Sequence, residues 1–194
     1  MFGLLILNGG VDFNNPIWQE AGLKIFTTID DLISKLEEAV LLLEDRIKIF
    51  NTYKVSNFEK YKFKNPNSEM KRILLVFDEA AEFLDKERYV TKDDKDKYNR
   101  IVNALSSLGG RGAGFGLHLC TITQSPSADI IPKFVRRNSG FRISFEADEI
   151  LSDIILGNQD AHLLIPKGTK GLCVTNHREL VKCFYVEDDE DYFK

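Results

Sequence analysis

The run ILLVF at residues 73–77 constrains the fold of this chain more than any other feature of its sequence. Five consecutive apolar residues between polar ones are typical of a strand that is buried on both faces, as in parallel sheets. Strand patterns also occur at residues 3–7 and 116–123, and apolar residues recur at helical spacing between Thr28 and Phe50. Strands that alternate with helices predict an α/β fold with a mostly parallel sheet covered on both faces.

The rest of the chain continues this alternation. We expect a solvated loop or helix end at residues 84–97 and a helix from Ile101 that stops at Gly109. Later elements are expected as a helix opening at Ser125, a strand at residues 140–145, a helix at residues 149–156 and a closing hairpin at residues 171–186. The length of 194 residues suits one domain, expected at residues 1–187, followed by an acidic tail at residues 188–194.

Composition excludes several classes of protein. Hydrophobic residues make up 43% and charged residues 29%, which is ordinary for a globular chain and unlike a disordered one. The formal net charge of -4 argues against a protein that coats DNA, so nucleic-acid contact would need a local basic patch. The three cysteines have no paired spacing, which favours buried thiols in a reducing cytosol over disulfides or a zinc site. Without an apolar run of membrane-spanning length or a signal-peptide pattern, we expect a cytoplasmic protein.

Two carboxylates, Asp78 and Glu79, directly follow the ILLVF run. Ligands of parallel sheets bind at the carboxyl ends of the strands, so both carboxylates are expected at that edge. This is the form of a Walker B strand, in which Asp78 would hold a water ligand of Mg²⁺ and Glu79 would polarise the water that attacks the γ-phosphate of ATP. The alternative is a core strand that merely ends in acidic residues.

Gln124 follows the strand pattern at residues 116–123. An amide at that point can sense the γ-phosphate or orient water; otherwise it caps the helix that opens at Ser125. The glycine-rich segment at residues 108–116 lacks G-K-[ST] and precedes a strand, so it fits no phosphate-binding loop. It is either a plain connection or a loop that presents Arg111 as a finger to the phosphate of a neighbouring subunit.

A basic cluster stands out in this acidic chain; it consists of Lys133, Arg136, Arg137 and Arg142. It is either a surface that contacts nucleic-acid phosphates with salt-dependent affinity or a solvated helix face. The three histidines have no metal-ligand spacing, so structural roles are expected for them.

The order of these pieces resembles the FtsK/SpoIIIE family of DNA translocases. The resemblance covers nearly the whole chain and is most specific in the segment GGRGAGFGLHLCTITQSPSADIIPKFVRRNSGFRISF, residues 109–145. It also includes LLILNGGVDF, LLEDRIKIF, ILLVFDEAAEF and ILSDIIL. Divergent members from conjugative elements and plasmids, which have the Gly-Gly-Val-acid-Phe form, are the most similar.

The resemblance implies a RecA-like P-loop NTPase fold, a three-layer sandwich, here without its N-terminal Walker A unit. It implies a ring, usually a hexamer, that uses ATP and Mg²⁺ to pump double-stranded DNA through its pore. By position, Asp78 and Glu79 correspond to the Walker B pair. Gln124 corresponds to the sensor, and Arg111 is the candidate for the finger that acts in trans.

Three departures from the family pattern matter. Ser125 replaces the arginine of the usual Gln-Arg-Pro. The loop from Arg111 to His118 is longer than in the family, which weakens the assignment of Arg111. The Walker A motif, G-x-x-x-x-G-K-[ST], is absent from the sequence and would be expected before Met1, so the chain alone should bind and hydrolyse ATP poorly.

We therefore expect part of an ATP-driven double-stranded DNA translocase, of the chromosome-segregation or the plasmid and conjugative-transfer type. It would work in a ring with copies of itself or with a Walker A-containing partner. One alternative is a non-hydrolytic pseudo-ATPase that binds DNA or a partner, and another is a fragment of a protein-secretion motor of the same family. An active enzyme with a nonstandard phosphate loop at residues 7–15 ranks last.

Overall fold

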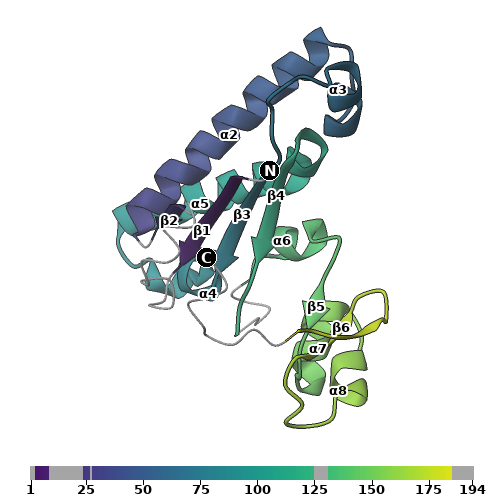
Figure 1. The fold of residues 1–194 in the computed structure, drawn as a ribbon. Helices are drawn as coiled ribbons and strands as arrows, with labels where there is room; N and C mark the ends of the chain where they lie inside the picture. Colours follow the sequence, from purple (N-terminus) through teal and green to yellow (C-terminus); the bar gives the residue numbers. More distant parts are fainter. Residues whose placement is uncertain (1–2, 9–23, 27, 125–130, 185–194) are drawn as a thin grey trace, which may run out of the picture. The chain divides into compact units, whose positions relative to one another are not determined.

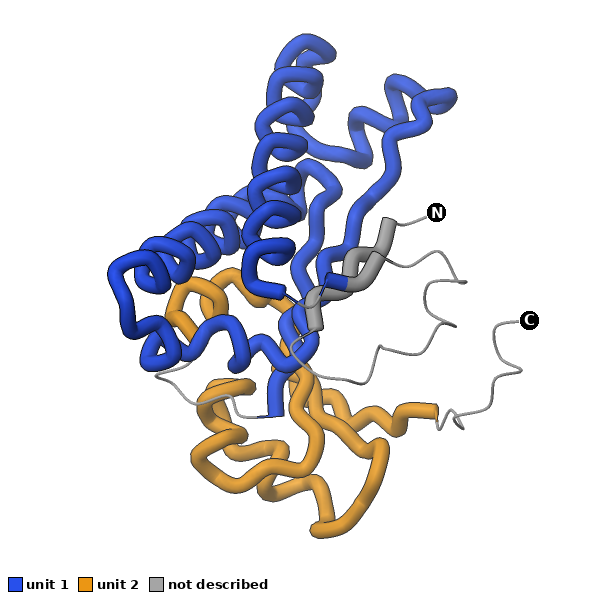
Figure 2. Tube along the Cα trace, turned by 90° about the vertical axis from the view of Figure 1, so that its left-hand side faces the viewer, with its two compact units in different colours: residues 1–124 blue, residues 125–194 orange. Residues whose placement is uncertain are grey.

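The computed structural model describes residues 3–8, 24–26, 28–124 and 131–184 (Figure 1). The chain divides into two compact units, residues 1–124 and residues 125–194, and each is described by itself (Figure 2). The single domain expected over residues 1–187 stays a prediction, and the acidic tail lies outside the described residues.

The first unit is built on a four-stranded sheet in the order β2-β1-β3-β4, in which all neighbouring strands are parallel. The strands are β1 (Gly3–Asn8), β2 (Lys24–Phe26), β3 (Ile73–Asp78) and β4 (Leu117–Thr121). On β3, Leu75 and Phe77 are buried, whereas Leu74 and Val76 on the opposite face are half-buried. The predicted parallel sheet, with β3 at the ILLVF run, is confirmed.

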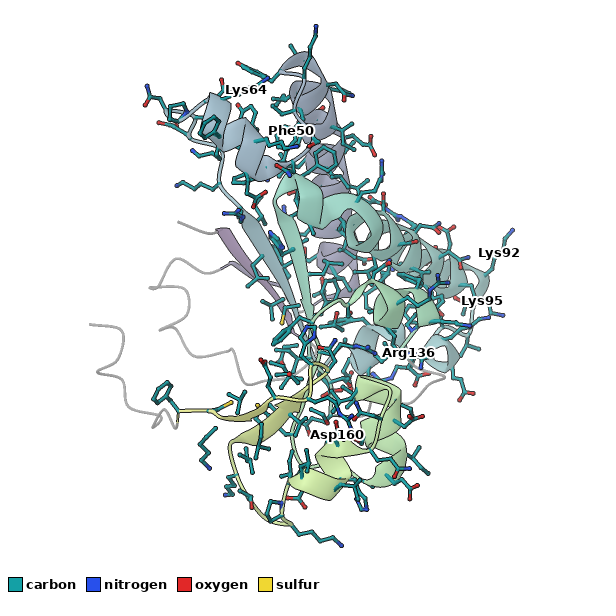
Figure 3. All side chains as sticks on the ribbon, turned by 90° about the vertical axis from the view of Figure 1, so that its right-hand side faces the viewer. Phe50, Lys64, Lys92, Lys95, Arg136 and Asp160 are labelled. Carbon is teal, nitrogen blue, oxygen red and sulfur yellow. The ribbon has the colours of Figure 1, made fainter. Side chains whose placement is uncertain are left out.

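Helices and 3-10 turns complete the first unit: α2 (Ile29–Thr52), α3 (Phe58–Lys64), α4 (Ala81–Leu84), η1 (Lys86–Arg88), α5 (Lys92–Arg111) and η2 (Gly112–Phe115). The two long helices, α2 and α5, pack against each other on one side of the sheet (Figure 3). Thr28 is the N-cap of α2, as predicted, because its hydroxyl oxygen accepts a hydrogen bond from the Asp31 N–H.

Helix α5 differs from its prediction at both ends. It begins at Lys92, within the charged stretch, because Thr91 and Asp94 form a capping box there. It then continues through the predicted stop at Gly109. The chain turns instead at Gly116, whose φ of +78° is left-handed and where a Cβ would lie 2.5 Å from an aromatic ring.

A buried arginine joins three segments of the first unit. Arg46 on α2 is 4% exposed, and its guanidinium donates to the carbonyl oxygen of Phe115 at 2.8 Å and to that of Lys71 at 2.7 Å. Burial lowers the pKa of Arg46, yet a guanidinium stays charged in proteins. Arg46 therefore ties α2 to η2 and to the segment that enters β3.

The second unit contains a three-stranded antiparallel sheet in the order β5-β6-β7. Its elements are α6 (Lys133–Asn138), β5 (Ile143–Ser144), α7 (Glu149–Leu156), α8 (Asp160–Leu164), β6 (Leu172–Thr175) and β7 (Leu180–Lys182). Leu156, Ala161, Ile165 and Val174 form a buried cluster between the helices α7 and α8 and the sheet.

Two predictions for the second unit are confirmed, the helix at residues 149–156 and the closing hairpin, which is β6 with β7. The strand expected at residues 140–145 is shorter, since only Ile143 and Ser144 pair with β6. The helix opening expected at Ser125 lies outside the described residues, and in the described part of that stretch helix α6 begins at Lys133. None of the described helices combines the length and the apolar character needed to cross a membrane.

We expect Arg46→Ala to lower the free energy of unfolding by about 2–3 kcal/mol, because two carbonyl oxygens lose their charged donor. Denaturant unfolding followed by circular dichroism measures the change. Lys48→Ala on the same helix is the control, because Lys48 and Asp45 form an exposed ion pair worth about 0.5 kcal/mol or less. Equal stability of the two variants would contradict the role given to Arg46.

Candidate nucleotide site

The parallel pairing of β3 with β4 brings the two predicted site segments together. The pairing continues past both strands: the Ile122 N–H donates to the Phe77 carbonyl oxygen, and the Ala80 N–H donates to that of Ile122, both at 2.8 Å. Asp78 and Glu79 therefore leave β3 beside the end of β4. This is the edge at which parallel sheets bind ligands.

Glu79 has an unusual conformation at this edge. Its φ of +47° lies in the left-handed region, which residues other than glycine rarely adopt. The Thr123 hydroxyl donates to Oε1 of Glu79 at 3.0 Å, and the Gln124 N–H donates to Oε2 at 3.1 Å. Both carboxylate oxygens are thus bound by the end of β4. A strained backbone that its surroundings hold in place is typical of functional sites.

Thr123 does not stand out in the sequence, because threonine is common in strands. The one available signal is its position directly before Gln124, at the end of the strand that neighbours β3. Gln124 itself is exposed and contacts Glu79 through its backbone N–H. The predicted use of the Gln124 side-chain amide as a sensor stays a prediction.

The chemistry of the site suits a magnesium ion. Asp78 and Glu79 are half-buried and supply hard oxygen atoms. Mg²⁺ at phosphate sites keeps several waters and takes one or two protein carboxylates. Within the described residues, no three His, Cys, Asp or Glu side chains come together as a closed metal site. Asp78 would therefore hold the ion together with water and phosphate oxygens.

Arg111 is not brought together with the two carboxylates. It ends α5, before β4 begins, whereas Asp78 is the last residue of β3 and Glu79 directly follows it. Its guanidinium donates to Glu44 on α2 at 2.7 Å and to the Ser107 hydroxyl at 2.8 Å. Within one chain, Arg111 thus lies near the amino end of β4, whereas the two carboxylates lie at the carboxyl end of β3. Its action in trans stays a prediction.

Another arginine of the first unit, Arg88, follows β3 closely in the sequence. Arg88, on η1, forms an ion pair with two hydrogen bonds to Glu82, which lies on α4 directly after the Walker B-like strand. Hydrogen bonding to Glu82 raises the pKa of Arg88. The pair also lines a surface hollow of about 250 Å³. The positive charge of Arg88 is therefore paired with Glu82 on α4.

The predicted basic cluster lies in the second unit. Three of its members come from α6, and Arg142 lies in the segment that leads into β5. Lys133 and Arg137 are exposed and line a surface hollow of about 420 Å³, whereas Arg136 and Arg142 are half-buried. The Nε atoms of Arg136 and Arg142 are buried without a recorded hydrogen-bond partner in the part of the chain that the structure describes. The exposed pair is therefore the part of the cluster that a phosphate could reach.

No protein-family model matches the chain. Curated relatives do match, among them proteins named DNA translocase FtsK. That of Helicobacter pylori is 25% identical over 148 residues, 74% of this chain and 16% of the relative. That of Borreliella burgdorferi is 28% identical over 150 residues, 74% of this chain and 18% of the relative. That of Campylobacter jejuni is 24% identical over 183 residues, 88% of this chain and 18% of the relative. The chain spans less than a fifth of the length of these relatives.

Solved structures match nearly the whole chain. The pCW3 conjugation coupling protein TcpA, in its monomer form with ATPγS, has a TM-score of 0.86 and 27% identity, over 97% of this chain and 54% of TcpA. EccC of Thermomonospora curvata, ATPases 2 and 3 with a signal sequence peptide, has a TM-score of 0.72 and 14% identity, over 96% of this chain and 33% of EccC. The second likeness shows the fold alone. The chain has the α/β fold of RecA-like P-loop ATPase motors, and its resemblance to the FtsK/SpoIIIE DNA translocases is confirmed.

Proposed function

We propose that this chain contributes the Walker B edge of an ATP-driven double-stranded DNA translocase, of the chromosome-segregation or the plasmid and conjugative-transfer type. The observation that carries the proposal is Glu79, held by Thr123 and Gln124 at the carboxyl edge of β3 and β4. The similarity to TcpA, which was solved with ATPγS, supports nucleotide binding by a motor of this fold. The motor would work in the cytoplasm.

In this proposal each residue of the edge has one task. Asp78 holds the Mg²⁺ that accompanies ATP, and this ion neutralises charge on the phosphates. Glu79 orients and polarises the attacking water, while Gln124 responds to the γ-phosphate. These 194 residues contain no G-x-x-x-x-G-K-[ST] motif, so the phosphates also need a Walker A segment that lies outside them. Copies of the chain or of the completed motor would form a ring, usually a hexamer, in which Arg111 could serve a neighbour's site.

A second candidate is a motor that moves proteins. Its support is the fold shared with EccC, which was solved with a signal sequence peptide. Cargo separates the two candidates, since a DNA motor needs phosphate contacts and a protein motor does not. A non-hydrolytic module is the third possibility, and substitution of Glu79 separates it from both motors.

The ATPase proposal predicts negligible turnover by the chain alone and DNA-stimulated turnover when a segment with G-x-x-x-x-G-K-[ST] is fused ahead of it or supplied in trans. Glu79→Gln should then lower kcat by about 10²–10⁴-fold, the usual contribution of a general base. Glu87→Gln removes a charge from an exposed neighbouring position and should leave kcat unchanged. Function that survives Glu79→Gln would favour the non-hydrolytic module.

Thr123 should act by holding the Glu79 carboxylate. In the completed motor, Thr123→Val keeps the side-chain shape but removes the donor, so kcat should fall about 10–100-fold, as for one hydrogen bond to a charged group. The KM for ATP should change little if Thr123 acts through its hydrogen bond to Glu79. Thr123→Ser retains the hydroxyl and should restore kcat to within a few-fold of wild type. Equal loss in both variants would show a packing role only.

The DNA proposal predicts that the exposed part of the basic cluster contacts phosphates. The double variant Lys133→Ala/Arg137→Ala should weaken duplex binding and reduce the slope of log K against log salt by about 1.8, since each phosphate contact contributes about 0.9. Fluorescence anisotropy with labelled duplex DNA at several salt concentrations measures both the affinity and this slope. Lys167→Ala/Lys170→Ala removes the same charge from exposed positions of the same unit. An equal effect of both double variants would show nonspecific electrostatic attraction of DNA to the unit and would contradict a role of this cluster.

A further inference from the structure

Two of the three cysteines lie together in the hairpin of the second unit. In the β6–β7 pairing, Cys173 is opposite Val181, and the Cys183 N–H donates to the Gly171 carbonyl oxygen at 2.7 Å. Cys183 is two residues beyond Val181, so it shares a face of the sheet with Cys173. Their sulfur atoms are 3.8 Å apart. The two thiols are therefore in van der Waals contact, and the pairing of the strands holds them there.

The two thiols have different surroundings. Cys173 is 2% exposed, and its Sγ also lies 3.5 Å from the Val181 carbonyl oxygen. Cys183 is exposed and directly follows β7. Burial and the neighbouring Cys183 raise the pKa of Cys173, so the exposed thiol is the one that an oxidant meets first. Cys120, the third cysteine, lies on β4 in the other unit.

We propose that Cys173 and Cys183 form a reversible dithiol–disulfide site that reacts with hydroperoxides. The Cys183 thiolate attacks the peroxide oxygen, which gives a sulfenic acid and releases water or an alcohol. The Cys173 thiolate then attacks the Cys183 sulfur, forms the S–S bond and expels the sulfenic oxygen as water. Two thiols and one hydroperoxide thus yield one disulfide, while the peroxide takes up the two electrons and both protons.

The hairpin can accommodate this bond and would be stabilised by it. The sulfur atoms must approach by about 1.8 Å more to reach disulfide length. β7 is an edge strand that pairs with β6, and its residues Leu180–Lys182 are all exposed, so its end can adjust. The bond would close the hairpin at the end opposite its turn and fasten β7 to β6. This inference does not depend on the proposed ATPase or DNA function.

The test is treatment of the purified chain with a small excess of hydrogen peroxide, followed by thiol titration in denaturant and peptide mapping without reductant. We expect loss of two of the three titratable thiols. The map should contain one peptide pair joined through Cys173 and Cys183, lighter by two hydrogens, and dithiothreitol should restore all thiols. Hydrogen exchange at Leu180–Lys182 should become about tenfold slower or more after oxidation.

Variants at single cysteines make the result specific. Cys183→Ser changes an exposed residue, so the hairpin should fold, but oxidation should produce no cross-link and no slowing of exchange. Cys120→Ser is the control and should retain both effects. Three titratable thiols after oxidation, a cross-link through Cys120 or a cross-link between two chains would each overturn the proposal.

Discussion

The parallel pairing of β3 with β4 determines both the core and the site of the first unit. Its hydrogen bonds continue beyond the strands to Ala80 and Ile122, so the register is the same in the sheet and at its carboxyl edge. A shift by one residue would turn Leu75 and Phe77 out of the core. The same shift would remove the segment after β4 from Glu79. Burial of apolar side chains therefore stabilises the geometry on which the proposed chemistry depends.

The amino ends and the carboxyl ends of the parallel strands in this sheet have different physical roles. At the amino edge, Arg46 satisfies two carbonyl oxygens, and Gly116 makes a turn that a side chain would obstruct. At the carboxyl edge, Glu79 has a left-handed backbone, and Thr123 and Gln124 bind its carboxylate. Strain persists only where the surrounding structure holds it, and at Glu79 the hydrogen bonds from Thr123 and Gln124 do so.

The two units also carry different chemistry. The first holds the acidic edge, with oxygen ligands suited to a magnesium ion and to activation of water. The second holds the basic cluster and the cysteine pair, on separate elements, α6 and the β6–β7 hairpin. In the proposed motor, ATP chemistry and DNA contact thus belong to different units of one chain. Oxidation of the hairpin would add a state that depends on neither.

Local pattern was sufficient for the α/β class, for β3, for the Thr28 cap of α2 and for the position of Asp78 and Glu79 at the carboxyl end of β3, because apolar runs and capping residues act over a few positions. The sequence prediction was wrong for both ends of α5. The helix begins at the capping box of Thr91 and Asp94, and it continues past Gly109 because the chain turns only at Gly116.

The hydrogen bond of Thr123 to Glu79, the burial of Arg46 and the contact of Cys173 with Cys183 were decided by tertiary structure. Each joins segments that only strand pairing or helix packing brings together, so the sequence does not show the contact itself.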